Sequence, residues 1–233
     1  MDPYKTLREE AWEANMEIPA RRLAIYTWGN VSALDREKGV FAIKPSGVAY
    51  DDLTPDSMVV VDLDGAVVDG TLNPSSDTET HRVLYREFPG VNGITHTHST
   101  YAAAWAQARR SVPVFGTTHA DHGAEYIPCT PVMDEDAVRN NYELETGNLI
   151  VKTFREAKKD PALMPMALVA GHGPFAWGEN AARSVYHAAV LEEVCKMALL
   201  TLTLDPRAAP LPEHIIRKHW ERKHGPDAYY GQR

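Results

Sequence analysis

The sequence predicts a single α/β domain in which helices cover a largely antiparallel or mixed sheet. At 233 residues the chain suits one sizeable domain, and 44% hydrophobic with 24% charged residues is ordinary for a globular protein. Short apolar runs separated by turn residues fill the first half, which indicates hairpins. Strand-like and helical segments alternate in the second half. We find no internal repeat and no linker that would mark a second domain.

The first half predicts a helix, three strand segments and a second helix. Residues 3–17 have an amphipathic helical pattern. Asp64-Gly65 lies between two apolar runs and predicts a hairpin turn. A helix within 75–90 is indicated by Ser and Asp at its start, apolar residues at helical spacing, and Pro-Gly as its stop. The strand segments are expected within 26–35, 39–47 and 57–70.

The second half predicts further strands, each followed by a helix. Residues 91–98 read as a strand that leads into a helix over 99–110, and residues 166–178 read as one more strand. A loop is expected over 116–130. Helices are expected over 134–158, 180–202 and 214–225, the last followed by the tail "PDAYYGQR".

Charge and composition exclude several classes of protein. The net charge of −8 argues against a nucleic-acid-binding protein, and the basic segment 214–225 has the spacing of a solvated helix face. No run approaches the roughly 18–20 apolar residues of a membrane helix. The N-terminus lacks the apolar centre of a signal peptide, and Cys129 and Cys195 are too few for a disulfide framework. We therefore expect a cytoplasmic protein, whose local site could still bind an anionic small molecule.

Three histidines point to a metal site. His96 and His98, in "GITHTHST", are two residues apart, so along a strand their side chains would leave the same face. His172, in "VAGHGPF", ends another apolar run and has glycines on both sides that allow close approach. Together they could hold zinc or a similar divalent ion, with a carboxylate as fourth ligand and an open position for substrate. The alternative is that each histidine is an isolated, hydrogen-bonded residue of the core or a turn.

A second group of residues is of the kind that holds an anion. Ser75 and Ser76 lie at the expected N-terminus of a helix, where free N–H groups and the helix dipole favour negative charge. The alternative for these serines is an ordinary helix cap with nothing bound. The segments "TWGNVS" and "IKPSG" add groups that suit a phosphate, although the Walker signature is absent. These groups are Gly29, Asn30, Lys44, Ser46 and Gly47.

With these pieces assembled, the chain resembles the class II aldolase/epimerase family along nearly its whole length. The resemblance is carried by ordered blocks of sequence. These are "TWGNVSALDRE", "FAIKPSG", "PSSDTETH", "GITHTHS", "GTTHAD", "IPCT", "ETGN", "GHGPFAWG", "VLEEV" and "RKHGPDAYYGQ". So many blocks in order are far more specific than the histidine spacing alone.

The resemblance implies a fold, an assembly and roles for particular residues. It implies one domain over 1–233 with α/β/α layers around the sheet, in a four-fold homotetramer whose active sites lie between subunits. His96, His98 and His172 would bind the metal, expected to be zinc with Mn²⁺ or Co²⁺ as alternatives, and Asp77 would lie in or beside its coordination sphere. Asp121 and Tyr230 would transfer protons, Tyr230 reaching the site of a neighbouring chain. Substrate and phosphate contacts would be Gly29, Asn30, Lys44, Ser46, Gly47, Ser75 and Ser76.

The resemblance also implies an activity, the metal-dependent conversion of L-ribulose 5-phosphate to D-xylulose 5-phosphate in sugar catabolism of the arabinose type. C4 of this substrate is β to the carbonyl and carries no acidic proton, so inversion requires cleavage and re-formation of the C3–C4 bond. The acid/base pair would then need pKa values moved toward neutrality. The family's aldolases carry a glutamate where this chain has Asp77, which favours the epimerase. After "HAD" the chain continues "HGAEY" where the family's epimerases tend to have aromatic residues, so we expect a differently shaped loop there.

Three other functions remain open at this stage. An aldolase would use the same metal and release the two fragments. A zinc hydrolase would activate water at the open metal position, with Asp77 or Asp121 as base. A structural metal site would have four protein ligands and no exchangeable position.

Overall fold

The computed structural model describes residues 2–231, and its centre is one seven-stranded sheet in which every neighbouring pair of strands is antiparallel. The strand order is β4-β3-β2-β1-β5-β7-β6. The first four strands form a meander, and the predicted hairpin at Asp64-Gly65 joins β3 to β4. The strands are β1 (Asn30–Asp35), β2 (Val40–Ile43), β3 (Val59–Asp62), β4 (Val67–Asp69), β5 (Gly93–His96), β6 (Met166–Leu168) and β7 (Pro174–Gly178).

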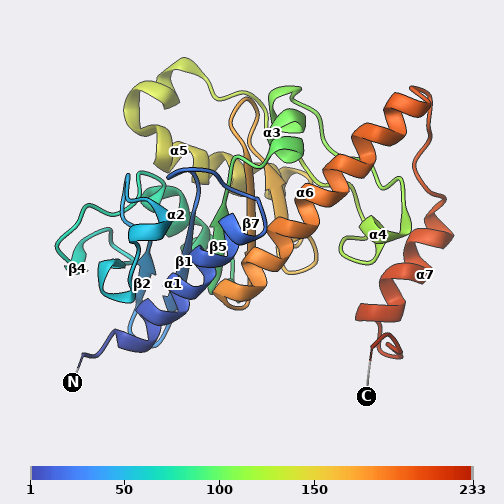
Figure 1. Cartoon of the computed structure of the whole chain (residues 1–233). Coiled ribbons are helices and arrows are strands. Elements are labelled where there is room, and N and C mark those ends of the chain that lie inside the picture. The colour runs from blue at the N-terminus through green and yellow to red at the C-terminus, as the bar shows by residue number, and fades with distance from the viewer. Residues whose placement is uncertain (1, 232–233) are drawn as a thin grey trace.

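Helices cover both faces of the sheet, which confirms the predicted α/β/α layers. In Figure 1, α1 and α6 cross the front of the sheet while α2 and α5 lie behind it. Helix α7 packs against the short α4 at the side of the molecule, beyond α6. The helices are α1 (Lys5–Ala20), α2 (Thr78–Glu87), α3 (Thr100–Gln107), α4 (Thr117–Ala120), α5 (Glu135–Glu156), α6 (Ala181–Leu204) and α7 (Glu213–His224), with 3₁₀ turns η1 (Tyr50–Asp52) and η2 (Pro55–Ser57).

Alternation along the strands decides which side chains face the site. Thr95 of β5 bonds Ser184 of α6, so its neighbour His96 points to the opposite face. The register places Asn30 of β1 beside His96, and His96 beside Phe175 of β7. These three side chains therefore form a row across adjacent strands, on the face that α2 and α5 cover.

Apolar packing on that face fixes α2 and α5 to the sheet. Phe88 at the end of α2, Phe154 of α5 and Trp177 of β7 are all buried, with ring centroids 5.1 to 5.5 Å apart. Tyr85 of α2 packs against Phe41 of β2 in the same way. Burial of aromatic rings of this size contributes about 1.5–3 kcal/mol each, so this cluster holds the layer under the site in place.

Four segments differ from the sequence-based expectation. Residues 166–178 are a hairpin rather than one strand, because the chain reverses at Gly171, whose φ of +74° a glycine adopts readily. The helix expected over 99–110 ends at Gln107, and the loop expected over 116–130 contains the one-turn helix α4. Helix α5 is interrupted at Asn141, whose φ and ψ of −159° and 93° are not helical.

Within residues 2–231, no helix is both long enough and apolar enough to cross a membrane.

Candidate active site

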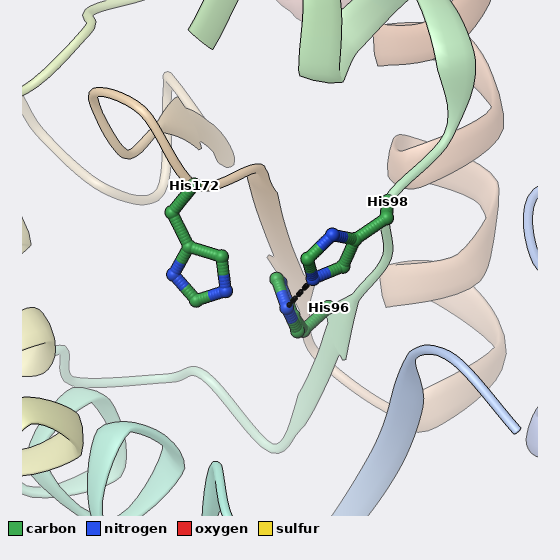
Figure 2. A group of neighbouring side chains, drawn as sticks. All are labelled: His96, His98 and His172. Carbon is green, nitrogen blue, oxygen red and sulfur yellow. Dashed lines mark hydrogen bonds between the residues drawn. The ribbon is translucent and has the colours of Figure 1, made fainter. Parts of the chain in front are cut away.

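The three histidines predicted from sequence lie together at one end of the sheet. His96 ends β5, His98 follows it by two residues, and His172 comes from the turn between β6 and β7 (Figure 2). The ligand nitrogens of the three rings all lie within 4.8 Å of one another, and the Nε2 atoms of His96 and His98 are 3.1 Å apart. A tetrahedral ion with zinc–nitrogen bonds of about 2.0–2.1 Å separates its ligand nitrogens by about 3.3 Å, so the geometry fits such an ion.

Outer contacts orient these rings as metal ligands. The Nδ1 of His96 donates to the carbonyl oxygen of Pro174 at 2.9 Å, which leaves its Nε2 bare and facing His98. The Nδ1 of His172 lies 3.3 Å from the hydroxyl of Tyr142. Burial, followed by repulsion from His96, lowers the pKa of His172 to about 4. Burial and His96 likewise lower the pKa of His98. The neutral rings that result are the form that binds metal.

Two glycines allow the backbone to come this close. A Cβ on Gly173 would lie 2.9 Å from the carbonyl oxygen of Thr97 and 3.4 Å from Cε1 of His96, so only glycine lets the β6–β7 turn approach the histidine strand. Gly29 has a φ of +78°, and a Cβ there would lie 2.8 Å from the carbonyl oxygen of His96. The loop before β1 therefore packs directly onto the metal-binding strand.

Asp77 lies beside the histidine cluster and does not cap its helix. It occupies the N-cap position of α2, but its side chain makes no capping hydrogen bond. Its Oδ2 instead accepts a hydrogen bond of 2.7 Å from Nδ2 of Asn30. Burial raises the pKa of this carboxyl, whereas His96, His81 and the Asn30 amide lower it more, so the net pKa falls below its ordinary value. Asp77 is thus a carboxylate held by strand β1.

The cluster forms one wall of a cleft of about 400 Å³. The cleft brings together all of the residues proposed from sequence as metal, phosphate and substrate contacts, from five separate segments of the chain. Its lining also includes residues that the sequence analysis did not select. The lining residues are Thr27, Trp28, Gly29, Asn30, Lys44, Pro45, Ser46, Gly47, Ser75, Ser76, Asp77, His96, His98, Tyr142, Glu143 and His172.

Tyr142 and Glu143 reach the cleft because of the break in α5. The side chain of Asn141 accepts a hydrogen bond of 3.1 Å from the N–H of Leu144 and so starts a new helical segment. The two residues after Asn141 are therefore at a helix N-terminus that borders the cleft. Asparagine is a poor residue for a helix interior and a good N-cap, which is the signal in the sequence that could have located them.

Lys44 supplies an uncompensated positive charge to the lining of the same cleft. Its side chain is buried, and Nζ donates to the carbonyl oxygen of Val48 at 2.7 Å and to that of Pro45 at 3.3 Å. Burial lowers its pKa to about 8. Among the described residues no carboxylate forms an ion pair with Lys44. A buried cation of this kind favours an anionic ligand.

Asp121 and Tyr230 lie in a second cluster, outside the described lining of the cleft. Arg222 of α7 makes two hydrogen bonds to the Asp121 carboxylate, the one from Nε to Oδ1 measuring 2.8 Å, and Nδ1 of His219 lies 3.1 Å from Oδ1. Burial raises the pKa of Asp121, but Arg222 and His219 lower it more. The net shift is away from neutrality, contrary to the expectation for an acid/base residue.

Tyr230 is exposed and lies against the same basic surface of α7. Its ring centroid is 4.4 Å from Nζ of Lys223 and 5.1 Å from Cζ of Arg222. The two predicted proton-transfer residues therefore share one end of the molecule and contact a common arginine. The structure brings them together with each other but not, within one chain, with the histidines.

Known proteins are similar to this one along almost the entire chain. The family model for the class II aldolase and adducin N-terminal domain matches residues 9–199. The L-ribulose-5-phosphate 4-epimerase UlaF of Salmonella paratyphi C is 50% identical over 227 residues, which covers 97% of this chain and 99% of that protein. The protein of the same name from Salmonella typhi is 49% identical over the same coverage.

Solved structures of the same architecture are also similar. An L-fuculose 1-phosphate aldolase matches with a TM-score of 0.78 and 23% identity, over 93% of this chain and 95% of that one. The L-fuculose-1-phosphate aldolase of Thermus thermophilus matches with a TM-score of 0.65 and 26% identity, over 89% of this chain and 100% of that one. At such identities the likeness establishes the fold.

Proposed function

The chain belongs to the class II aldolase and adducin N-terminal domain family, and from that premise we propose that it epimerises L-ribulose 5-phosphate at C4 to D-xylulose 5-phosphate. The observation that carries the proposal is the composition of the cleft. Three histidines and a carboxylate line the same cleft as a buried lysine and serine hydroxyls. A ligand that uses both groups of residues has metal-binding oxygens and a phosphate.

The phosphate end of the substrate is assigned to Lys44, Ser46, Gly47, Ser75 and Ser76. Lys44 supplies the charge, and the serine hydroxyls supply further donors. The loop that contains Ser75 and Ser76 leads directly into α2, whose N-terminus favours negative charge. A phosphate held in this way is a fixed point for the aldehyde fragment during the reaction.

The other end is assigned to His96, His98 and His172, with Asp77 in or beside the coordination sphere. A divalent ion there, which we take to be zinc, would supply a Lewis acid for the carbonyl oxygen of the substrate. Asn30 holds Asp77 by its amide, and Pro174 and Tyr142 orient two of the rings. The protein side of the site is thus arranged before substrate binds.

The chemistry itself is cleavage and re-formation of the C3–C4 bond. Removal of the C4 hydroxyl proton allows the bond to break, which gives the enediolate of dihydroxyacetone and glycolaldehyde phosphate. The aldehyde then turns about its bound phosphate and is attacked on its other face, where its oxygen is protonated. We assign removal of this proton to the carboxylate of Asp121 and protonation on the other face to the phenol of Tyr230. The reverse reaction exchanges these roles.

Assembly brings the two clusters into one site in this proposal. Asp121 and Tyr230 lie outside their own chain's cleft, so the proposal assigns them to the cleft of a neighbouring subunit in a homotetramer. The test mixes two inactive variants, His98→Asn and Tyr230→Phe, and lets the subunits exchange. Shared sites would restore activity in about a quarter of the sites, since each needs one intact residue from each chain. Sites within single chains would leave every mixture inactive.

Product analysis tests the activity. The protein is incubated with L-ribulose 5-phosphate, with and without a chelator, and the sugars are separated. We expect D-xylulose 5-phosphate, formed only without the chelator and formed again after zinc is restored. Accumulation of free dihydroxyacetone without D-xylulose 5-phosphate would instead establish the aldolase alternative, which the fold likeness to fuculose-phosphate aldolases makes the second candidate.

We also propose that the protein is cytoplasmic, as its cysteine chemistry suggests. Cys129 and Cys195 are both free thiols, as a reducing compartment favours.

A further inference from the structure

Two hydrogen-bonded pairs connect β1 to α2 next to the histidine cluster. Asn30 and Ser32 are two apart on β1, and His81 of α2 comes four residues after the N-cap residue Asp77, so each pair of side chains shares a face. Nδ2 of Asn30 donates to Asp77, and Oγ of Ser32 lies 2.7 Å from Nδ1 of His81. The Asn30–Asp77 pair borders the cleft, whereas Ser32 and His81 are completely buried behind it.

Each pair contains one buried atom that has no partner in the described structure. These atoms are Oδ1 of Asn30 and Nε2 of His81. A buried polar atom without a hydrogen bond typically costs about 1–3 kcal/mol, so two of them in successive pairs along β1 require an explanation. They would satisfy each other if one is an acceptor and the other a donor. Oδ1 of Asn30 is an acceptor. Whether Nε2 of His81 is a donor depends on which tautomer the imidazole adopts.

Neighbouring hydroxyls determine that tautomer. The hydroxyl of Tyr85 lies 2.6 Å from Oγ of Ser32, and burial raises the pKa of Tyr85, so the phenol keeps its proton. Among the hydrogen bonds of the described residues, Oγ of Ser32 is the one acceptor for that proton, so we infer that Ser32 donates its own proton to Nδ1 of His81. A neutral imidazole whose Nδ1 accepts carries its single N–H at Nε2. The two unpartnered atoms are therefore a donor and an acceptor.

We propose that His81 is a positioning residue, whose Nε2–H reaches Oδ1 of Asn30 through one buried water molecule. This contact fixes the orientation of the Asn30 amide. With Oδ1 held on the His81 side, Nδ2 must face Asp77 and Oγ of Ser75, as the structure shows. A reversed amide would place an oxygen against the Asp77 carboxylate and repel it from its position beside the histidines. His81 thus controls Asp77 without contacting substrate.

This inference deepens the proposed function and relies on it only for the consequence in catalysis. Two substitutions distinguish the role of Nε2 of His81 from the role of Nδ1. In His81→Gln the side-chain amide nitrogen takes the place of Nε2, and in His81→Asn it takes the place of Nδ1. We expect His81→Gln to keep zinc affinity near that of the parent protein and His81→Asn to lose about 10-fold or more, as changes to outer partners of a metal site typically do. Zinc affinity is measured by competition with a chelator.

A matched control comes from another buried histidine. His187 of α6 is bonded through Nδ1 to the carbonyl oxygen of Trp177 and lies outside the cleft lining. The variants His187→Gln and His187→Asn should both lower the melting temperature, and their zinc affinities should be the same. The opposite order at His81, with the Asn variant retaining zinc and the Gln variant losing it, would show that only the Ser32 bond matters and would overturn the proposal.

A second measurement needs no substrate and no variant. Nitrogen-15 NMR of the histidine rings in the substrate-free protein reports which nitrogen of His81 carries the proton. We expect a protonated Nε2 that exchanges slowly with solvent. A protonated Nδ1 would overturn the proposal, whether or not the protein epimerises L-ribulose 5-phosphate. If Nε2 of His81 is protonated and the zinc affinities follow the expected order, but the protein does not epimerise L-ribulose 5-phosphate, then the proposed function alone is refuted.

Discussion

Replacing Lys44 with methionine removes the buried charge that we assign to the phosphate. Methionine preserves most of the side-chain volume, so the change isolates the ammonium group. A charge-assisted hydrogen bond contributes about 1.5–3 kcal/mol, so KM for the phosphorylated substrate should rise roughly 10- to 150-fold. The variant Lys38→Met is the control, because it removes an exposed lysine that forms a surface ion pair with Asp35, and its KM should not change.

The same substitution should not destabilise the protein. Burial moves the pKa of Lys44 from 10.5 to about 8, which costs the charged form about 3 kcal/mol in the folded state. Below pH 8 the lysine is charged in both states, so the folded state carries the full cost. Between pH 8 and 10.5 the unfolded state binds more protons, and stability rises with pH. Methionine removes this cost.

Two assays measure these effects of Lys44. Thermal unfolding at pH 7 should give Lys44→Met a melting temperature equal to or above that of the parent protein. The KM of the parent should rise above pH 8, as Lys44 loses its proton, while the KM of the variant should not respond to this titration. A KM that the substitution leaves unchanged at pH 7, or a large fall in melting temperature, would refute the assignment of Lys44 to the phosphate.

Three further changes test the site. Gly173→Ala places a Cβ 2.9 Å from the carbonyl oxygen of Thr97, so the turn must move and zinc affinity in a chelator competition should fall by roughly 10-fold or more. Tyr142→Phe removes the hydroxyl next to a histidine ring, and the same assay should show a loss of roughly 10-fold; unchanged affinity would exclude that role. Arg222→Gln removes the principal donor that lowers the pKa of Asp121, so the acid limb of the kcat profile should move to higher pH; an unmoved limb would exclude Asp121 as the base.

The layered fold could be predicted from sequence because its strands and helices carry clear periodicity. The break in the segment 166–178 could not be located from periodicity, because apolar residues lie on both sides of "GHGP", where the chain reverses with a positive φ at Gly171. Periodicity likewise misses the break at Asn141, where only the N-cap preference of asparagine marks the start of a new helical segment. Periodicity detects which residues are buried, but it does not detect a local change of backbone direction.

The histidine cluster could be expected from spacing, whereas its surroundings could not. His96 and His98 are fixed relative to each other by strand geometry, and the glycines around His172 indicated close approach. The bond between Asp121 and Arg222 joins residues 101 apart in sequence, and no local pattern reports such a contact. Ser and Asp before the helix indicated only where it starts, whereas the Asp77 carboxylate makes no cap and accepts a hydrogen bond from Asn30 of strand β1, a contact between distant residues.

The central claim is that epimerisation at C4 proceeds by breaking the C3–C4 bond, and isotope effects on the reaction test it most directly. The protein is supplied with L-ribulose 5-phosphate labelled with carbon-13 at C3, and in a separate experiment with deuterium at C4. Bond cleavage predicts a normal carbon-13 effect at C3, with no primary deuterium effect at C4. A primary deuterium effect at C4 without any carbon-13 effect at C3 would show that the C4–H bond breaks instead, and it would contradict the role assigned to this site.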